Sequence, residues 1–137
     1  MNTCEEKRDE VKKTRKSREK PEPLLKFYNE NLVKFEGCFV KINELEYSRA
    51  ESDCTDLIVT LGVNGAQYKD KKYPAKEVEV SDVCGAGDTF LAALVAQYLF
   101  TKDIEKSIIF ANVAAGITVQ HRGNYAPSYD EIRHAGY

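Results

Sequence analysis

The chain has 137 residues, 42% of them hydrophobic and 31% charged, with 20 Lys and Arg against 22 Asp and Glu. This length and balance suit one globular domain and exclude collagen-like, disulfide-rich and wholly disordered classes. A formal net charge of −2 excludes a general attraction to nucleic acid or anionic lipid. Because no apolar run approaches the length of about 18 residues that a membrane span needs, we expect a soluble, cytoplasmic α/β protein.

The start of the chain differs from the rest in charge. Residues 1–20 carry eight basic and five acidic side chains, whereas the remainder carries 12 basic and 17 acidic ones. We therefore expect residues 1–23 to be a charged tail that ends at two prolines, and residues 24–137 to form one partial domain. The alternative, a nucleic-acid-binding arm, is disfavoured because interspersed Glu and Asp dilute the positive field.

Helical and strand-like patterns alternate after the tail. An amphipathic pattern predicts a short helix over residues 24–36, and apolar runs predict strands at 38–42 and 56–61. Two further short strands, 66–69 and 77–80, are expected to form an antiparallel ribbon beside that pair. The first half of the chain therefore has the composition of a small sheet.

Three helices are predicted in the second half. Residues 89–100 are apolar on nearly every side, which predicts a buried helix, and residues 103–120 carry small side chains suited to close helix packing. The pattern Ser128-Tyr129-Asp130-Glu131 is a capping box, so a last short helix should begin there.

The segment most informative about chemistry lies between the last predicted strand and the apolar helix. Gly85, Ala86 and Gly87 would leave backbone N–H groups unpaired at a helix N-terminus, with almost no side-chain bulk. An anion such as a phosphate would be held there, and Asp88 would lie close enough to accept a proton from an attacking hydroxyl. The alternative is a tight turn in which Asp88 only caps the helix, and glycine-rich turns are common enough to keep both open.

Residues 82–90, Asp-Val-Cys-Gly-Ala-Gly-Asp-Thr-Phe, resemble the D-T-x-G-A-G-D signature of the PfkB (ribokinase-like) family of carbohydrate kinases. Val83 stands where that family usually has Thr. Three more motifs agree in order: residues 43–46 are similar to the N-x-x-E element, 60–66 to the T-x-G-x-x-G nucleotide loop, and 111–115 to the adenine-side helix. The resemblance extends over about residues 38–132.

The resemblance implies an ATP-dependent kinase that phosphorylates a hydroxyl of a sugar or sugar phosphate. Asp88 would be its catalytic base, and the Gly85–Gly87 turn would be the anion hole for the γ-phosphoryl group. The implied nucleotide-binding residues are Thr60, Gly62, Asn64, Gly65 and Asn112. For Asn112, a helix-packing role is an equal alternative.

Metal ions are also implied by the resemblance. Asn43 and Glu46 would act on magnesium, mainly through bound water, although an ordinary helix N-terminus would explain the same spacing. Asp82 matches the carboxylate that holds a monovalent cation such as potassium in the family. Because Val83 lacks the usual Thr hydroxyl, potassium dependence stays open. Gly123 matches the family's glycine in the loop that closes the side of the site where this cation is held.

The implied fold is the C-terminal, nucleotide-binding part of a ribokinase-like three-layer α/β/α fold with a mostly parallel sheet. Family enzymes are longer, and nothing in residues 1–37 looks like their sugar-binding half. We therefore expect an incomplete copy whose uncovered face needs a missing N-terminal half or a second copy of the chain. Among family members, residues 39–47 together with residues 82–84 are most similar to heptose-phosphate kinases. The competing function is an inert nucleotide-binding or assembly module derived from such a kinase.

Overall fold

The computed structural model describes residues 37–50 and 56–137, which belong to two compact units. The first unit comprises Met1–Val59 and Gln67–Lys71, and the second comprises Thr60–Ala66 and Lys72–Tyr137. The expected tail at 1–23 and the expected helix at 24–36 lie outside the described residues.

The described strands form one four-stranded sheet in the order β1-β2-β3-β4. They are β1 (Val40–Asn43), β2 (Leu57–Thr60), β3 (Ala66–Tyr68) and β4 (Lys71–Tyr73). Because short turns join β2 to β3 and β3 to β4, these neighbours run antiparallel. The α/β class is confirmed, but these residues contribute mostly antiparallel pairs to it and not the mostly parallel sheet that we expected.

Three of the four predicted strands are present, and the strand predicted at 77–80 is wrong. The strand β4 pairs with β3 in its place, because the chain reverses direction at Lys69 and Asp70. Lys69 has a left-handed φ of 53° in this turn. Tyr73 is buried and Pro74 follows it, and a proline cannot donate the next ladder hydrogen bond. Residues 74–80 have no regular secondary structure.

The described residues of the first unit contain short strands and one short helix. The strand β1 leads directly into α3 (Glu44–Arg49), and Asn43 is the N-cap of that helix. Ile58 of β2 is fully buried, as expected for the β-branched centre of a strand. The Tyr68 hydroxyl donates a hydrogen bond to Asp56 Oδ1 at 2.8 Å, which ties the end of β3 to the start of β2.

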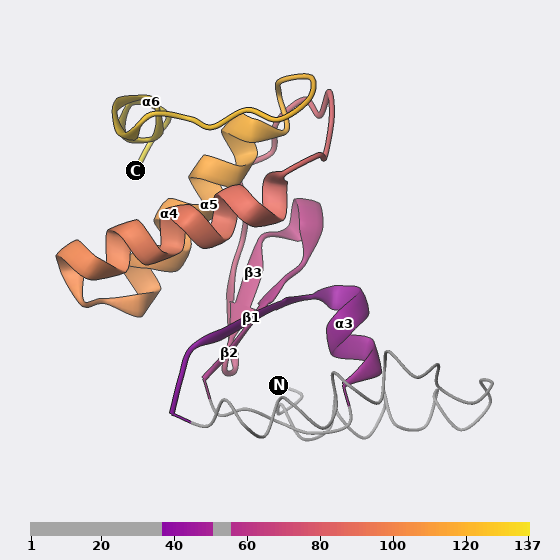
Figure 1. The fold of residues 1–137 in the computed structure, drawn as a ribbon, viewed down its shortest axis with the longest axis vertical. Coiled ribbons are helices and arrows are strands. Elements are labelled where there is room, and N and C mark those ends of the chain that lie inside the picture. Colours follow the sequence, from indigo (N-terminus) through magenta and orange to yellow (C-terminus); the bar gives the residue numbers. More distant parts are fainter. Residues whose placement is uncertain (1–36, 51–55) are drawn as a thin grey trace. The chain divides into compact units, whose positions relative to one another are not determined.

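The second unit is built on a helical hairpin. The helices α4 (Ala86–Thr101) and α5 (Ile104–Thr118) lie side by side, and α6 (Tyr129–His134) packs on α5 (Figure 1). All three helices were predicted. Their buried core includes Phe90, Leu94, Ile108, Phe110, Ala111 and Ala114.

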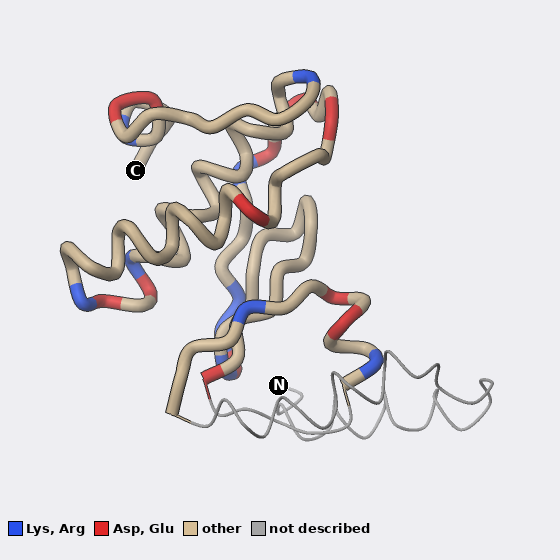
Figure 2. The backbone as a smooth tube through the Cα atoms, viewed as in Figure 1, with Lys and Arg blue, Asp and Glu red and all other residues tan. Residues whose placement is uncertain are grey.

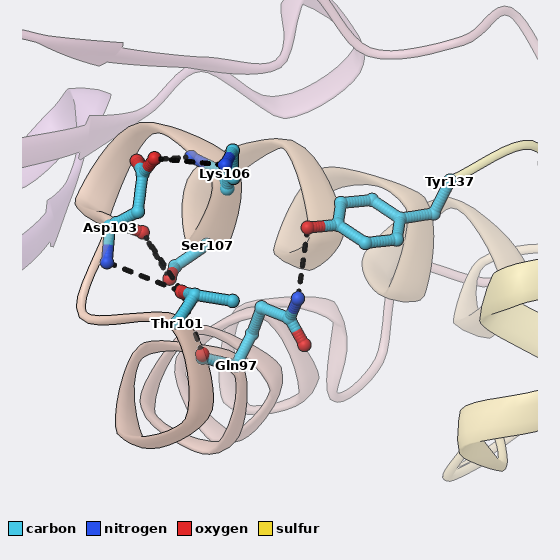
Figure 3. A network of polar contacts seen from close by, with 6 residues as sticks. All are labelled: Gln97, Thr101, Asp103, Lys106, Ser107 and Tyr137. Carbon is cyan, nitrogen blue, oxygen red and sulfur yellow. Dashed lines mark hydrogen bonds and ion pairs between the residues drawn. The ribbon is translucent and has the colours of Figure 1, made fainter.

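Polar contacts close the corner between α4 and α5, as Figure 3 shows. Asp103 caps α5 by accepting a hydrogen bond from Lys106 N at 3.1 Å, and Ser107 Oγ donates to Asp103 O at 2.6 Å. The Thr101 hydroxyl donates to Gln97 O at 3.0 Å. The Asp103 side chain satisfies a backbone N–H that the start of α5 leaves unpaired, and the two hydroxyl contacts add second hydrogen bonds to backbone carbonyls of the same corner.

The burial expected for the apolar helix at 89–100 is present on one side of α4 and absent on the other, where cover from elsewhere was expected to be needed. Phe90 and Leu94 are buried, whereas Leu91, Val95 and Leu99 are exposed. None of the helices in the described ranges is long and apolar enough to cross a membrane.

Candidate active site

The turn before α4 has the backbone geometry of an anion site. Gly85 is the N-cap of α4 with φ 76° and ψ 0°, a left-handed conformation that glycine adopts without strain. Val83 O accepts a hydrogen bond from Ala86 N, but no group in the described part of the chain accepts one from the N–H of Gly87 or Asp88. These donors are therefore available to a ligand at the positive end of the helix dipole.

The Asp82 carboxylate joins two loops through backbone hydrogen bonds. Its Oδ1 accepts from Cys84 N at 3.0 Å, and its Oδ2 accepts from Gly123 N at 2.9 Å. These hydrogen bonds stabilise the charged form, so the pKa of Asp82 lies below its ordinary value of 3.8. Asp82 is thus an ionised clasp between the turn and the loop that contains Gly123.

The same loop supports the turn at further points. Val119 O accepts hydrogen bonds from Ser81 N at 2.7 Å and from Asp82 N at 3.1 Å. Cys84 Sγ lies 3.3 Å from Asn124 Oδ1, to which it donates. A Cβ atom on Gly85 would lie 3.0 Å from Asn124 Oδ1, so Gly85 is also packed closely against this loop.

Thr118 holds the other side of the turn, and the sequence did not point to it. Its hydroxyl is fully buried at the end of α5, 3.1 Å from Thr89 Oγ1 and 3.0 Å from Tyr125 O. It therefore joins the first turn of α4 to the chain that follows α5. A threonine beside a predicted helix end is an ordinary feature of sequences, so only the fold shows this role.

Asp88 lies in the first turn of α4 and is exposed. No described residue forms a hydrogen bond or an ion pair with its carboxylate. The carboxylate shares the helix N-terminus with the two unpaired N–H groups. Asp88 does not cap the helix, because Gly85 is the N-cap and no side chain forms a capping hydrogen bond.

The predicted nucleotide loop is a tight turn between β2 and β3. After Thr60 the chain forms a single 3₁₀ turn, η2 (Gly62–Asn64), and Leu61 N donates to Gly65 O at 2.7 Å. Gly62 and Asn64 are exposed, and a Cβ on Gly62 would meet nothing. Gly65 is buried with φ 90°, and a Cβ there would overlap the backbone of Tyr73 and its neighbours.

Asn112 is buried in α5 and forms a hydrogen bond to the backbone carbonyl of Tyr73, next to Gly65. Its side-chain Nδ2 donates to Tyr73 O at 2.9 Å, and this carbonyl is the group nearest to the Gly65 position. The packing role that we had left open for Asn112 is therefore present. Contact of Asn112 or Gly65 with a nucleotide stays a prediction.

Asn43 and Glu46 belong to the first unit, where they cap α3. Asn43 Oδ1 accepts from Glu46 N at 2.7 Å, and Glu46 Oε2 accepts from Asn43 N at 2.8 Å. This reciprocal capping box explains the three-residue spacing without a metal ion. The described residues contain no group of three or more His, Cys, Asp or Glu side chains placed to hold a metal.

Comparison with known proteins places these motifs in a family. Residues 41–131, well over half of the chain, match the profile of the pfkB family of carbohydrate kinases. The chain belongs to the pfkB family. The matched range agrees closely with the extent of about residues 38–132 that the motifs had indicated.

Relatives and solved structures support the assignment. The bifunctional protein HldE of Nitratiruptor is 36% identical over 118 residues, covering 80% of this chain and 25% of that protein. The nucleoside kinase of Methanocaldococcus jannaschii, an archaeal ribokinase-family member, is 29% identical with a TM-score of 0.68, covering 84% of this chain and 46% of that one. Arabidopsis thaliana ribokinase, solved with ribose and ATP, is 25% identical with a TM-score of 0.67, covering 78% and 42%.

The match covers only part of each of these proteins. Eight HldE proteins are matched over 16% to 25% of their length. Within this pfkB-family chain, the second unit brings together the clasp, the turn and Asp88. The second unit also contains the nucleotide loop and Asn112, whereas the magnesium candidates belong to the first.

Proposed function

We propose that this chain carries the nucleotide-binding and catalytic part of an ATP-dependent kinase that phosphorylates a hydroxyl of a sugar or sugar phosphate. The observation that supports this most is the combination at the start of α4. Unpaired N–H groups of Gly87 and Asp88 and the exposed Asp88 carboxylate lie on one helical turn. An anion and the hydroxyl that attacks it need this pairing of donors and base.

The proposed step moves one phosphoryl group and one proton. The acceptor hydroxyl oxygen forms a bond to the γ-phosphorus of ATP while its proton passes to the Asp88 carboxylate. The bond between the γ-phosphorus and the β,γ-bridging oxygen breaks, and ADP leaves with that electron pair. The Gly85–Gly87 turn would bind the charge that develops on the γ-phosphoryl oxygens, and Thr60, Gly62 and Asn64 would contact the nucleotide.

Magnesium and a monovalent cation fit this proposal to different degrees. In the capping box, only Oε2 of Glu46 is used, and the carboxylate would act on magnesium mainly through bound water, which that ion retains readily. Bound magnesium would neutralise phosphate charge. The Asp82 carboxylate is ionised, as a ligand for a monovalent cation must be, but both of its oxygens already accept N–H groups.

The acceptor is the least specified part of the proposal. Arabidopsis ribokinase was solved with ribose and ATP, and the curated relatives are named bifunctional protein HldE. The similarity of residues 39–47 and 82–84 to heptose-phosphate kinases makes a heptose phosphate our first choice of acceptor. The cytoplasm, as the source of ATP, is the proposed location.

A second candidate is an inert nucleotide-binding module. It is favoured by one observation, that the chain corresponds to only 42% to 46% of the two solved kinases. Incubating the 137-residue chain with ATP, Mg²⁺ and a panel of sugars, sugar phosphates and heptose phosphates tests both candidates. Acceptor-dependent ADP formation supports the kinase. Nucleotide binding in calorimetry without turnover supports the inert module, and absence of binding rejects both.

A further inference from the structure

The end of α5 holds the chain on both sides of the turn before α4. Val119 O accepts hydrogen bonds from Ser81 N and Asp82 N, which precede the turn. The Thr118 hydroxyl lies 3.1 Å from Thr89 Oγ1, which follows the turn. Two consecutive residues of α5 and its C-cap therefore fix the two ends of the segment that carries the unpaired N–H groups.

The position of Thr118 is not explained by the ordinary contact of a helical threonine. A buried threonine in a helix commonly bonds to the carbonyl four residues earlier, which here is Ala114 O. That carbonyl lies 3.3 Å from Thr118 Oγ1, farther than Tyr125 O at 3.0 Å and Thr89 Oγ1 at 3.1 Å. Because Thr118 is fully buried, it makes its polar contacts within the protein, and the two shorter ones join it to other segments.

The order of protons along this path follows from which groups can donate. The Thr118 hydroxyl has one proton, and a carbonyl oxygen only accepts. Tyr125 O has no other donor in the part of the chain that the structure describes, so the Thr118 proton belongs to that hydrogen bond. The Thr89 hydroxyl therefore donates to Thr118 Oγ1. The first turn of α4 is thus tied through Thr118 to the loop after α5.

Asp88 depends on this attachment, because no side chain on its own helix holds it. It is the only charged residue of α4, and Figure 2 shows the tube uncoloured from there to the corner with α5. No cation on the next turn of the helix can therefore pair with its carboxylate. Gly85, which joins the turn to the helix, has no side chain to restrict the backbone. The orientation of the helix start is thus set by its contacts with α5 and the following loop.

We propose that Thr118 is a positioning residue for the anion site. Its hydroxyl, through Thr89, holds the first turn of α4, so the N–H groups of Gly87 and Asp88 are fixed before an anion binds. Donors that are already fixed lose no further conformational entropy on binding, and this preorganisation increases affinity. The inference rests on the proposed function, because it takes the turn to be the phosphate site.

An NMR titration of the 137-residue chain with inorganic pyrophosphate tests this inference without requiring turnover. The amide resonances of Gly87 and Asp88 report the dissociation constant at the turn itself. Thr118→Val keeps the shape of the side chain and removes the hydroxyl, so the dissociation constant should rise about fivefold, as expected for one lost hydrogen bond. Thr118→Ser keeps the hydroxyl and should restore the wild-type affinity.

Two controls separate positioning from a general loss of stability, which urea unfolding measures for each variant. Ile108→Val shortens a fully buried side chain of α5, so it should lower the free energy of unfolding and leave pyrophosphate affinity unchanged. Thr101→Val makes the same substitution at the far end of α4, where the hydroxyl donates to Gln97 O, and should also leave affinity unchanged. Equal weakening of binding by Ile108→Val and Thr118→Val would overturn the proposal.

A double-mutant cycle tests the path through Thr89. Thr89→Val should weaken pyrophosphate binding, and combining it with Thr118→Val should cause no further loss, because both changes remove the same hydrogen bond. Additive losses would contradict the path. Equal affinity in the wild type and Thr118→Val would overturn the positioning role alone, whereas a wild type that does not bind pyrophosphate would overturn the phosphate site as well. The two failures are therefore distinguishable.

Discussion

Two glycine-containing loops of the second unit, at Gly65 and at Gly85, differ in how closely other residues pack against them. In the loop between β2 and β3, Gly65 is buried against the Tyr73 carbonyl, with no room for a side chain. In the turn before α4, a Cβ on Gly85 would meet only the tip of the Asn124 side chain, and the N–H of Gly87 has no acceptor within the described ranges. The space around Gly65 is therefore filled by backbone atoms of the same chain, whereas the turn before α4 has a backbone N–H group that no described residue uses.

This difference shows that similar glycine patterns in one sequence have separate causes. Gly65 is explained by packing alone, because φ 90° and the neighbouring backbone both exclude a side chain. The turn before α4 has no such complete explanation from packing. Glycine substitutions in the two loops should therefore affect different properties of the protein.

The largest effect is expected for Gly65→Ala. The added Cβ would overlap backbone atoms in a conformation that only glycine adopts readily, so the free energy of unfolding should fall by about 3 kcal/mol. Urea unfolding followed by circular dichroism measures this. Gly62→Ala is the matched control: its φ is also positive, at 57°, but a Cβ there meets nothing, so the loss should be about 1 kcal/mol. Equal losses would mean that packing does not distinguish the two glycines.

Gly87→Val should affect binding more than folding. Bulk at this position would block the approach of a phosphate to the backbone N–H, so ATP and ADP binding should fall below detection in calorimetry. Ala92→Val places the same side chain at an exposed position of α4 and controls for the lower helix propensity of valine. Wild-type nucleotide affinity in Gly87→Val would remove the turn from the phosphate site.

Asp88→Asn should affect the chemical step alone. Since a base acts mainly in the transition state, turnover should drop by about 10²-fold or more while nucleotide affinity stays nearly constant. The comparison requires measurable turnover, from the chain by itself or with the missing part supplied. A variant with wild-type turnover under those conditions would exclude Asp88 as the base.

The smallest effect concerns the clasp that supports the turn. The folded-state pKa of Asp82 is lowered by the N–H groups of Cys84 and Gly123, so its stabilising contribution is present above the unfolded value. That contribution should be lost as the pH falls through 3.8 toward the lower folded-state pKa. The thermal midpoint of the wild type should exceed that of Asp82→Asn at pH 6, and the gap should shrink below pH 4. A gap that is independent of pH would show that the carboxylate charge is not what holds the two loops together.

Local patterns predicted most of the fold. The capping box at Ser128 placed α6 correctly, and the β-branched run placed β2, because both signals act within a few residues. The strand β4 was missed because Lys71 and Lys72 look like loop residues, and only Tyr73 is buried. An uncovered apolar face was expected, but the sequence does not show that Leu91, Val95 and Leu99 form it, because an apolar pattern does not tell which side of a helix its neighbours cover.

A sequence pattern was enough to propose the residues of the candidate site, whose function stays a prediction, but it did not show the residues that support them. The Gly85–Asp88 segment carries a recognisable pattern, and its local geometry follows from glycine and helix-end chemistry. The contacts of Thr118 and Asn124 with the turn join residues 29 or more positions apart, and no local pattern encodes such pairs. For the same reason, the sequence could not decide between a packing role and a nucleotide-binding role for Asn112. Its amide donates a hydrogen bond to Tyr73 O, a contact that a sequence motif does not reveal.

The capping box at Asn43 and Glu46 affects how motif matches are interpreted. Selection for helix stability alone would preserve an asparagine and a glutamate at this spacing, even in a descendant that had lost its metal. A motif match at such positions is therefore evidence of shared ancestry and of a helix cap, and it is not by itself evidence of metal binding. Among possible replacements, Glu46→Gln is the informative one, since glutamine keeps the cap and discards the charge, whereas alanine would remove both at once.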